Sequence, residues 1–93
     1  MSGASAQGRF EIVNVLGLHA RAATKLVQLA SRFRCDVEVS REGQKANAKS
    51  VMGVLLLCGS KGTFLDVAAA GDGAEDAVRA IGELIASRFG EPE

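Results

Sequence analysis

Two stretches of this 93-residue chain have the pattern of amphipathic helices with a single apolar stripe. In residues 20–33 and 74–89 the core-type apolar positions recur at intervals of three and four, and charged or polar residues fill most other positions. Such a helix has one face to bury. Because the segments between them favour strands with one buried face, the pattern predicts helices packed on one side of a sheet whose other side meets water.

The segments beside the helices predict strands. They are rich in β-branched residues or alternate between polar and apolar residues, and they end at glycines or polar turns. The expected strands cover residues 10–16, 35–40, 44–49 and 63–70. Glu42 and Gly43 supply a turn that joins the two middle strands in a hairpin.

Polar residues mark where two of the helices begin. Ser50 precedes residues 51–57, which are too apolar for a turn and too few for a long helix, so a short helix with Ser50 as its N-cap is expected. Asp72 is expected to cap the last helix, with Glu75 completing a capping box. The order is then βαββαβα. The fold class is α+β, a two-layer open-faced sandwich in which helices cover one face of a four-stranded antiparallel sheet.

Length, charge and hydropathy limit the function classes. Residues 1–8 are small and polar and are expected to form a loose tail, and residues 9–93 a single domain. Eleven basic and eleven acidic side chains cancel and the chain has no Trp or Tyr, which argues against nucleic-acid binding. The longest strongly apolar run, residues 54–58, is far too short to span a bilayer. We expect a cytoplasmic protein without membrane insertion.

The cysteines and glycine-rich turns indicate neither a metal nor a cofactor. Cys35 and Cys58 form no CxxC pair, and with one histidine a metal site would need carboxylates to complete it. Both cysteines are expected to be buried as small hydrophobic residues. The turns at residues 59–62 and 71–73 lack the other residues of phosphate-binding and dinucleotide-binding loops.

The only histidine, His19, is the candidate for chemistry. It lies where the first expected strand gives way to a helix, so a phosphoryl group there would meet unpaired amides and the positive end of a helix dipole. An imidazole is largely a free nucleophile at neutral pH and can attack phosphorus. Arg21 could stabilise the transferring oxygens. Gly17 could adopt a positive φ or allow a close approach of the loop to the helix end.

Each of these residues also has an ordinary structural interpretation. A lone histidine is more often structural than functional, and an arginine such as Arg21 is, taken alone, more often a solvated surface residue. Ser50 is by default a capping serine. With no second histidine and with scattered carboxylates, the sequence shows neither an acid–base pair nor a nucleophile–base triad.

The short helix expected over residues 51–57 carries more apolar side chains than it can bury. Some of Val51, Met52 and Leu55 are then expected to face water or a partner, and with Ala20 they form a candidate docking surface beside His19. For any one of these side chains, a place in the core beneath a loop is an equally open alternative.

Residues 17–21, Gly-Leu-His-Ala-Arg, and residues 49–53, Lys-Ser-Val-Met-Gly, together resemble the motifs of HPr, the histidine-containing phosphocarrier family of bacterial phosphotransferase systems. The resemblance covers about residues 9–89. It implies that His19 accepts a phosphoryl group on Nδ1 from phospho-enzyme I and passes it to a sugar-specific IIA component, with the help of Arg21. The match at Ser50 implies regulatory phosphorylation by an ATP-dependent HPr kinase/phosphorylase.

In this interpretation the protein is a monomeric carrier that needs partner enzymes and is no enzyme by itself. One alternative is a regulatory interaction protein controlled at Ser50, with little or no role in sugar transport. Another is a small-ligand-binding sandwich in which His19 is a loop residue. Ala22 departs from the family pattern, where proline usually follows the arginine, and this bears on transfer rate and partner range. Lys49 is expected to help the fold tolerate phosphate on Ser50.

Overall fold

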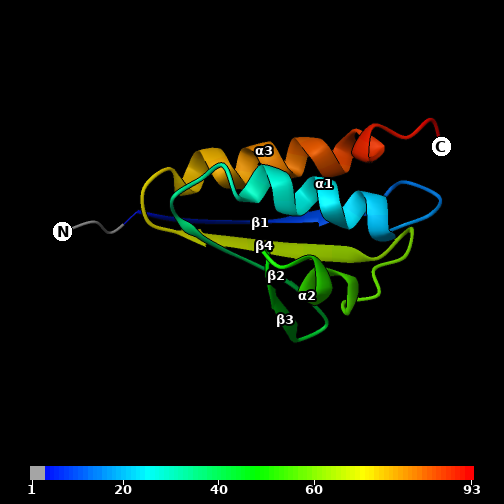
Figure 1. Ribbon diagram of the computed structural model, residues 1–93, viewed down its shortest axis with the longest axis horizontal. Helices are drawn as coiled ribbons and strands as arrows, with labels where there is room; N and C mark the ends of the chain where they lie inside the picture. Colours follow the sequence, from blue (N-terminus) through cyan, green and yellow to red (C-terminus); the bar gives the residue numbers. More distant parts are fainter. Residues whose placement is uncertain (1–3) are drawn as a thin grey trace.

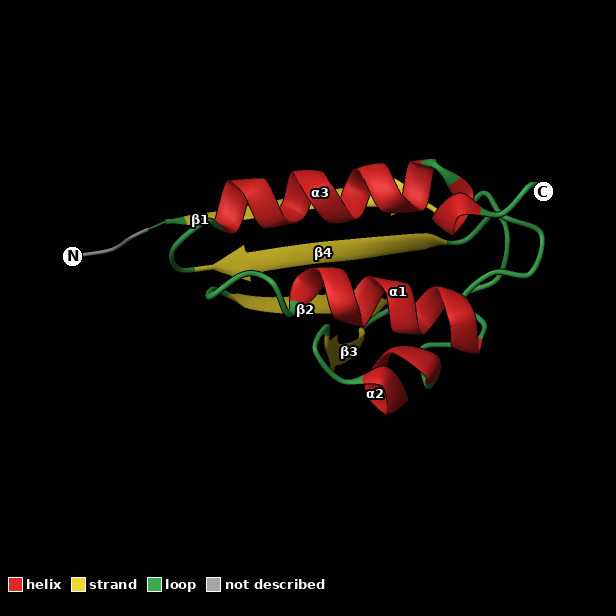
Figure 2. Ribbon diagram, turned by 45° about the horizontal axis from the view of Figure 1, so that its top comes forward, coloured by secondary structure: helices red, strands yellow, loops and turns green. Residues whose placement is uncertain are grey.

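The computed structural model describes residues 4–93, and its elements follow the expected order βαββαβα. In this part of the chain, strands β1 (Ser5–Glu11), β2 (Asp36–Arg41), β3 (Gln44–Asn47) and β4 (Phe64–Ala70) form one antiparallel sheet in the order β1-β4-β2-β3. Helices α1 (Ala20–Ala30) and α3 (Ala74–Ala86) cover one face of it, and the short helix α2 (Val51–Leu55) lies beside α1 and β3 (Figures 1 and 2). The α+β open-faced sandwich is confirmed.

The core lies between the sheet and the two long helices. On the inner strand β4, Leu65, Val67 and Ala69 are buried, whereas the residues between them face the open side of the sheet. The helices bury their apolar stripes against these strands, with Leu26 from α1 and Ile81 from α3 fully enclosed. Each such side chain stabilises the fold by about 1.5–3 kcal/mol. The single stripe on each helix therefore determines the two layers.

The first strand begins earlier than the sequence indicates. β1 covers Ser5–Glu11 rather than residues 10–16, so residues 5–8, expected in a loose tail, belong to the sheet. The reason is tertiary: every residue of β1 has a partner in β4, from Ser5 opposite Ala70 to Glu11 opposite Phe64. Pairing of the backbone thus orders a segment whose small polar side chains carry no strand signal. The rest of the expected tail, residues 1–3, lies outside the described residues.

The expected hairpin turn is confirmed and the expected capping box is wrong. Glu42 and Gly43 both have positive φ, 52° and 83°, as in the tight turns that suit the twist of paired strands. The N-cap of α3 is Gly73 rather than Asp72, and among residues 4–93 no side-chain bond caps this helix. Gly73 has a φ of 81°, a conformation that glycine adopts without steric cost. Glu75 remains in the first turn, where its charge complements the helix dipole.

Two further expectations are corrected at the ends of helices. The long helices stop at Ala30 and Ala86, three residues short of the expected ends. Cys35 is buried as expected, but Cys58 is exposed. Cys58 lies in the turn after α2 with a φ of 54°, and the same turn directs the preceding Leu57 into the core. No helix within residues 4–93 is long and apolar enough to cross a membrane.

Candidate functional site

His19 is the N-cap of α1, with an extended backbone (φ −78°, ψ 179°) and no capping bond from its side chain. Among the described residues, no backbone or side-chain acceptor pairs with the amides of Ala20, Arg21 and Ala22, the first three of the helix. These amides and the helix dipole place partial positive charge next to the imidazole, whose side chain is 28% exposed. A phosphoryl group carried by this ring would therefore meet both solvent and hydrogen-bond donors.

The loop that carries His19 is fixed by Gly17. This residue has a φ of +65°, and a Cβ placed on it would come within 2.4 Å of the Gly59 carbonyl oxygen. The neighbouring Leu18 N–H donates a 2.8 Å hydrogen bond to that same oxygen. Both properties expected of Gly17, positive φ and close approach, are present, although the close contact is with the turn after α2 rather than with the end of α1. The His19 loop is thereby joined to that turn.

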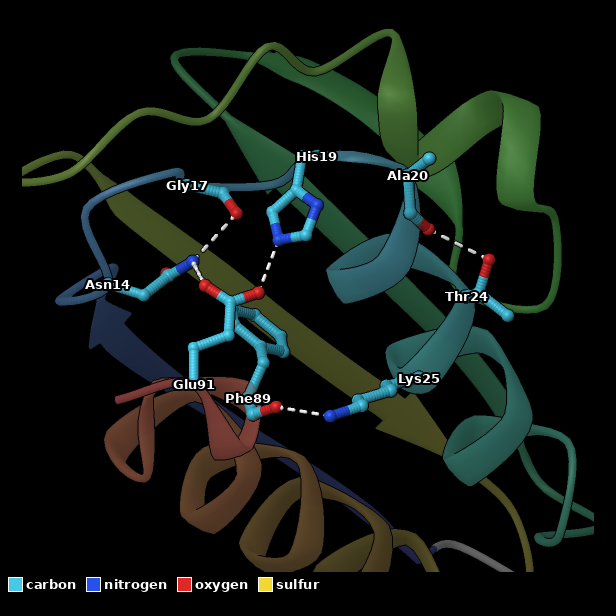
Figure 3. Close-up of polar contacts among 8 residues, drawn as sticks. All are labelled: Asn14, Gly17, His19, Ala20, Thr24, Lys25, Phe89 and Glu91. Atoms are coloured by element: carbon cyan, nitrogen blue, oxygen red, sulfur yellow. Dashed lines mark hydrogen bonds and ion pairs between the residues drawn. The ribbon is translucent and has the colours of Figure 1, made fainter. Parts of the chain in front are cut away.

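Glu91 contacts His19 and was not found from the sequence. Figure 3 shows the Glu91 carboxylate between Asn14 and the His19 ring: Oε2 is hydrogen-bonded to Nε2 of His19, and Oε1 accepts a 2.9 Å bond from Nδ2 of Asn14. The hydrogen bond from His19, followed by that from Asn14, lowers the pKa of the Glu91 carboxyl below its ordinary value. At neutral pH this group is therefore ionised.

The ionised carboxylate determines which ring nitrogen of His19 is free. A carboxylate can only accept hydrogen bonds, so Nε2 must carry the ring proton that it donates to Glu91. In the neutral imidazole the other nitrogen, Nδ1, then keeps an unshared electron pair. Nδ1 lies on the side of the ring that faces Ala20, at the start of α1 (Figure 3). The nucleophilic nitrogen and the unpaired amides are thus on the same side.

A left-handed turn after α3 brings Glu91 to the site. Arg88, Phe89 and Gly90 have positive φ values of 62°, 54° and 78°, a strained conformation for the first two. Two contacts support this turn: the Phe89 side chain is fully buried, and its carbonyl oxygen accepts a 2.7 Å hydrogen bond from Lys25 Nζ in α1 (Figure 3). Glycine and proline near the end of the chain signalled only that the helix stops. The contact between residues 72 positions apart had no local signal.

A surface hollow of about 610 Å³ surrounds the His19 ring. Arg21 lines it from the first turn of α1, exposed and without an ion pair among the described residues. Val15 and Leu16 form its apolar rim and are 52% and 68% exposed. These two were expected in the first strand, and they are exposed because the strand ends at Glu11. The hollow is therefore lined by the cationic Arg21, by the carboxylates of Glu91 and Glu93, and by apolar side chains.

The second motif, residues 49–53, leads into α2, and the expected cap at Ser50 is confirmed. Ser50 is the N-cap, and its Oγ accepts a 3.1 Å bond from the Gly53 amide. The Nζ atom of Lys49 donates hydrogen bonds to the carbonyl oxygens of Phe33 and Cys35, at 2.8 and 2.9 Å. This ammonium group holds the loop after α1 in the unphosphorylated chain, and the expectation that Lys49 offsets the charge of a phosphate on Ser50 stays a prediction.

The expected docking residues differ in exposure. Met52 is 68% exposed and Ala20 is exposed, but Val51 and Leu55 are half-buried against the core. Leu56, which the sequence did not single out, is 60% exposed on the same short helix end. We call Met52 and Leu56 the α2 apolar surface. Their exposure follows from the length of α2, which is too short to turn every apolar side chain inward.

Known proteins are similar to this chain in sequence and in fold. Residues 6–87 match the family described as "PTS HPr component phosphorylation site". The phosphocarrier protein HPr of Neisseria meningitidis serogroup A is 43% identical over 83 residues, 89% of this chain and 93% of that protein. The crystal structure of HPr-C-His from Thermoanaerobacter tengcongensis is 42% identical with a TM-score of 0.90, covering 95% and 99% of the two chains. That of an HPr dimer from the same organism is 45% identical with a TM-score of 0.75, covering 88% and 94%.

The fold and the site define a small open-faced sandwich that presents one histidine at the N-terminus of a helix. The family match spans most of the chain, and the relatives are named for carrying phosphate. The chain belongs to the HPr family of phosphocarrier proteins of the phosphotransferase system.

Glu91→Gln should reduce stability at neutral pH and have little effect in acid. Because the folded pKa of Glu91 is lowered, its contribution is complete above the ordinary carboxyl pKa of about 4.3 and is lost as the pH falls through the folded value. Urea unfolding of both proteins between pH 7 and pH 2.5 measures this difference. Asp66, whose pKa Arg9 also lowers, contributes equally to both and cancels. Glu93→Gln is the control, and a pH-independent difference for Glu91→Gln would contradict the prediction.

Proposed function

We propose that this protein is the phosphoryl carrier between phospho-enzyme I and a sugar-specific IIA component, with Nδ1 of His19 as the atom that receives phosphate. One observation carries the proposal: the hydrogen bond from Nε2 to the Glu91 carboxylate leaves Nδ1 as the unprotonated nitrogen beside the start of α1. A structural histidine would have no need of a partly exposed ring with a free nitrogen on the side of the helix start.

The transfer follows from the groups around the ring. Nδ1 attacks phosphorus as the bond to the donor's leaving atom breaks, and the first-turn amides and Arg21 receive the oxygens on which negative charge gathers. The ring then carries a proton on Nε2 and phosphorus on Nδ1, and Glu91 compensates the positive charge of that ring. A phosphoimidazole with Nε2 protonated is a reactive donor, because the leaving group is a neutral imidazole. The same contacts thus serve acceptance and release.

We propose that the protein does this work as a monomer in the cytoplasm and that it is a carrier without catalytic activity of its own. His19, Arg21, Asn14 and Glu91 all belong to one chain, and the hollow around the ring opens to the surface, where another protein could approach. A relative from Thermoanaerobacter tengcongensis has been crystallised as a dimer. Two free thiols suit a reducing compartment.

His19→Ala should abolish labelling by radioactive phosphoenolpyruvate and enzyme I, because this chain has no second imidazole. The wild-type adduct should be stable in base and labile in acid, and ¹⁵N spectra should place phosphorus on Nδ1. Arg21→Ala should still be labelled, at a rate about a hundredfold lower, since it loses one charged donor to the transferring group. Label on folded His19→Ala would refute the carrier role.

Partner docking is proposed to use the α2 apolar surface together with Ala20. Met52 and Leu56 are exposed on a helix that contacts α1, and apolar contacts of this kind form the centre of protein interfaces. Val51 and Leu55 support these residues from below, since both also pack against the core. Of the expected docking residues on α2, Met52 is therefore the one that can be changed without disturbing the core.

Met52→Lys should weaken binding of enzyme I at least tenfold while the melting temperature stays nearly constant, because a charge is placed in an apolar contact. Phe64→Lys is the matched control. Phe64 is 48% exposed on the open side of the sheet, where the new lysine would face Glu11 and also Arg9, whose charge is paired with Asp66. Calorimetry of both variants measures affinity. Equal affinities for folded Met52→Lys and wild type would remove this surface from the proposed interface.

Regulation is proposed to act through phosphorylation of Ser50 by an HPr kinase/phosphorylase. Ser50 is half-exposed at the start of α2, and Gly53, whose amide binds the Ser50 hydroxyl oxygen, leaves space beside it. A Cβ at Gly53 would stand 3.3 Å from that oxygen. A phosphate with a charge of about −1.5 to −2 can keep the bond to the Gly53 amide, so we expect the fold to persist and the charge of the α2 surface to change.

Phosphorylation of Ser50 should slow phosphoryl transfer to His19 at least tenfold, because a dianion beside an apolar contact must be desolvated or repelled when enzyme I docks. Transfer rates of untreated and kinase-treated protein are compared at several enzyme I concentrations. Ser50→Ala treated in the same way is the control and should keep its rate. Unchanged rates with one phosphate on every Ser50 would rule out this switch.

A further inference from the structure

Asn14 is a buried polar residue that contacts Glu91, the hydrogen-bond partner of His19. Its side chain is fully buried, and both protons of its amide are engaged: Nδ2 donates to Glu91 Oε1 and to the Gly17 carbonyl oxygen, each at 2.9 Å (Figure 3). The amide oxygen, Oδ1, is buried without a hydrogen-bond partner in the described structure. An unsatisfied buried acceptor costs about 1–3 kcal/mol, so the amide is kept at a cost that its two donated hydrogen bonds must offset.

The two oxygens to which Asn14 donates explain why this side chain is an amide. The bond to the Gly17 carbonyl fixes the amide so that Nδ2 and not Oδ1 faces Glu91. An inverted amide would place its own oxygen against both the Gly17 carbonyl oxygen and Glu91 Oε1. An aspartate at this position would place a second carboxylate against Glu91. The side chain at position 14 is thus restricted to a neutral donor, and what it holds is the carboxylate that binds the His19 ring.

We propose that Asn14 is a positioning residue for phosphoryl transfer, which holds the Glu91 carboxylate in the orientation that keeps the ring proton of His19 on Nε2 and leaves Nδ1 free. The inference deepens the proposed carrier role and rests on it. Without the bond from Asn14, Glu91 keeps one oxygen unpaired and can rotate away from the ring. The neutral imidazole then divides between its two tautomers, and the fraction with Nδ1 available falls.

Two measurements test this role. The first is the ¹⁵N spectrum of the His19 ring in the unphosphorylated protein, which reports the tautomers and needs no partner enzyme. Wild type should hold the neutral ring in the Nε2–H form, and Asn14→Leu should raise the Nδ1–H fraction. The second is the transfer rate from phospho-enzyme I, which should fall about tenfold in Asn14→Leu, as is typical when an outer partner of a functional histidine is lost.

A double-mutant cycle separates positioning from a structural effect. In a Glu91→Ala background, Asn14→Leu should change the transfer rate by no more than about twofold, because the group through which it acts is gone. An equal rate loss in both backgrounds would mean that Asn14 acts on the loop and would overturn the proposal. Asn47→Ala, which removes an exposed amide on β3, is the control and should leave the tautomers unchanged.

The remaining outcomes are also decisive. If Asn14→Leu does not fold, Asn14→Ala removes the amide without adding volume, and unfolding of both would assign Asn14 a structural role and overturn the proposal. Unchanged tautomers in a folded variant would overturn it as well. Failure of wild type to accept phosphate would refute the carrier role alone, since the tautomer measurement on unphosphorylated protein would still report whether Asn14 acts on His19.

Discussion

Burial of one sheet face beneath α1 and α3 fixes where the functional groups of this protein can lie. The two helices pack on the same face, and the beginning of α1 and the end of α3 meet at one end of the sandwich (Figure 1). This arrangement brings the positive end of the first helix next to the segment that leaves the last one. His19 and Glu91 come together there although 72 positions separate them. The site is therefore a consequence of how the layers pack, and its two halves come from segments that are far apart in the sequence.

The polar groups at that end form a series of contacts in which each group fixes the position of the next. Lys25 and the buried Phe89 ring hold the left-handed turn, which places Glu91 between Asn14 and His19. The conformational strain of the turn and the unpaired oxygen of Asn14 both oppose folding. Costs of this kind are common where function requires a fixed geometry. Here they are offset by the core beneath, so that one nitrogen of a half-exposed ring is kept free.

The elements that could be predicted from the sequence are those whose signal is local. Helix α1, the hairpin turn at Glu42 and Gly43, the Ser50 cap and the positive φ of Gly17 all depend on residues within a few positions of each other. His19 and Arg21 are singled out in the same way, and the structure places both at the start of α1 as expected. These patterns have a definite physical origin in backbone geometry and capping, and they hold without knowledge of the rest of the fold. The capping box expected at Asp72 and Glu75 is equally local and does not form, because Gly73 takes the N-cap position.

What the sequence could not indicate depends on distant partners. β1 begins at Ser5 because β4 lies beside it, and Glu91 reaches His19 because a left-handed turn redirects the chain. Lys49 follows the same rule, since the carbonyl oxygens that it binds belong to the loop after α1. A sequence pattern indicates only that a residue is charged or small. It carries no information on which acceptor, strand or ring will be adjacent once the layers have packed.

The balance of charge bears on how such a carrier meets its partners. With eleven basic and eleven acidic side chains the protein has no net charge to steer association over long distances. Recognition must then depend on what surrounds the site. Val15 and Leu16 border the His19 hollow, and the α2 apolar surface supplies further exposed apolar side chains on a neighbouring helix. A partner that covers such surfaces would exclude water from the ring, and in that drier setting the first-turn amides and Arg21 would act more strongly on a transferring phosphoryl group.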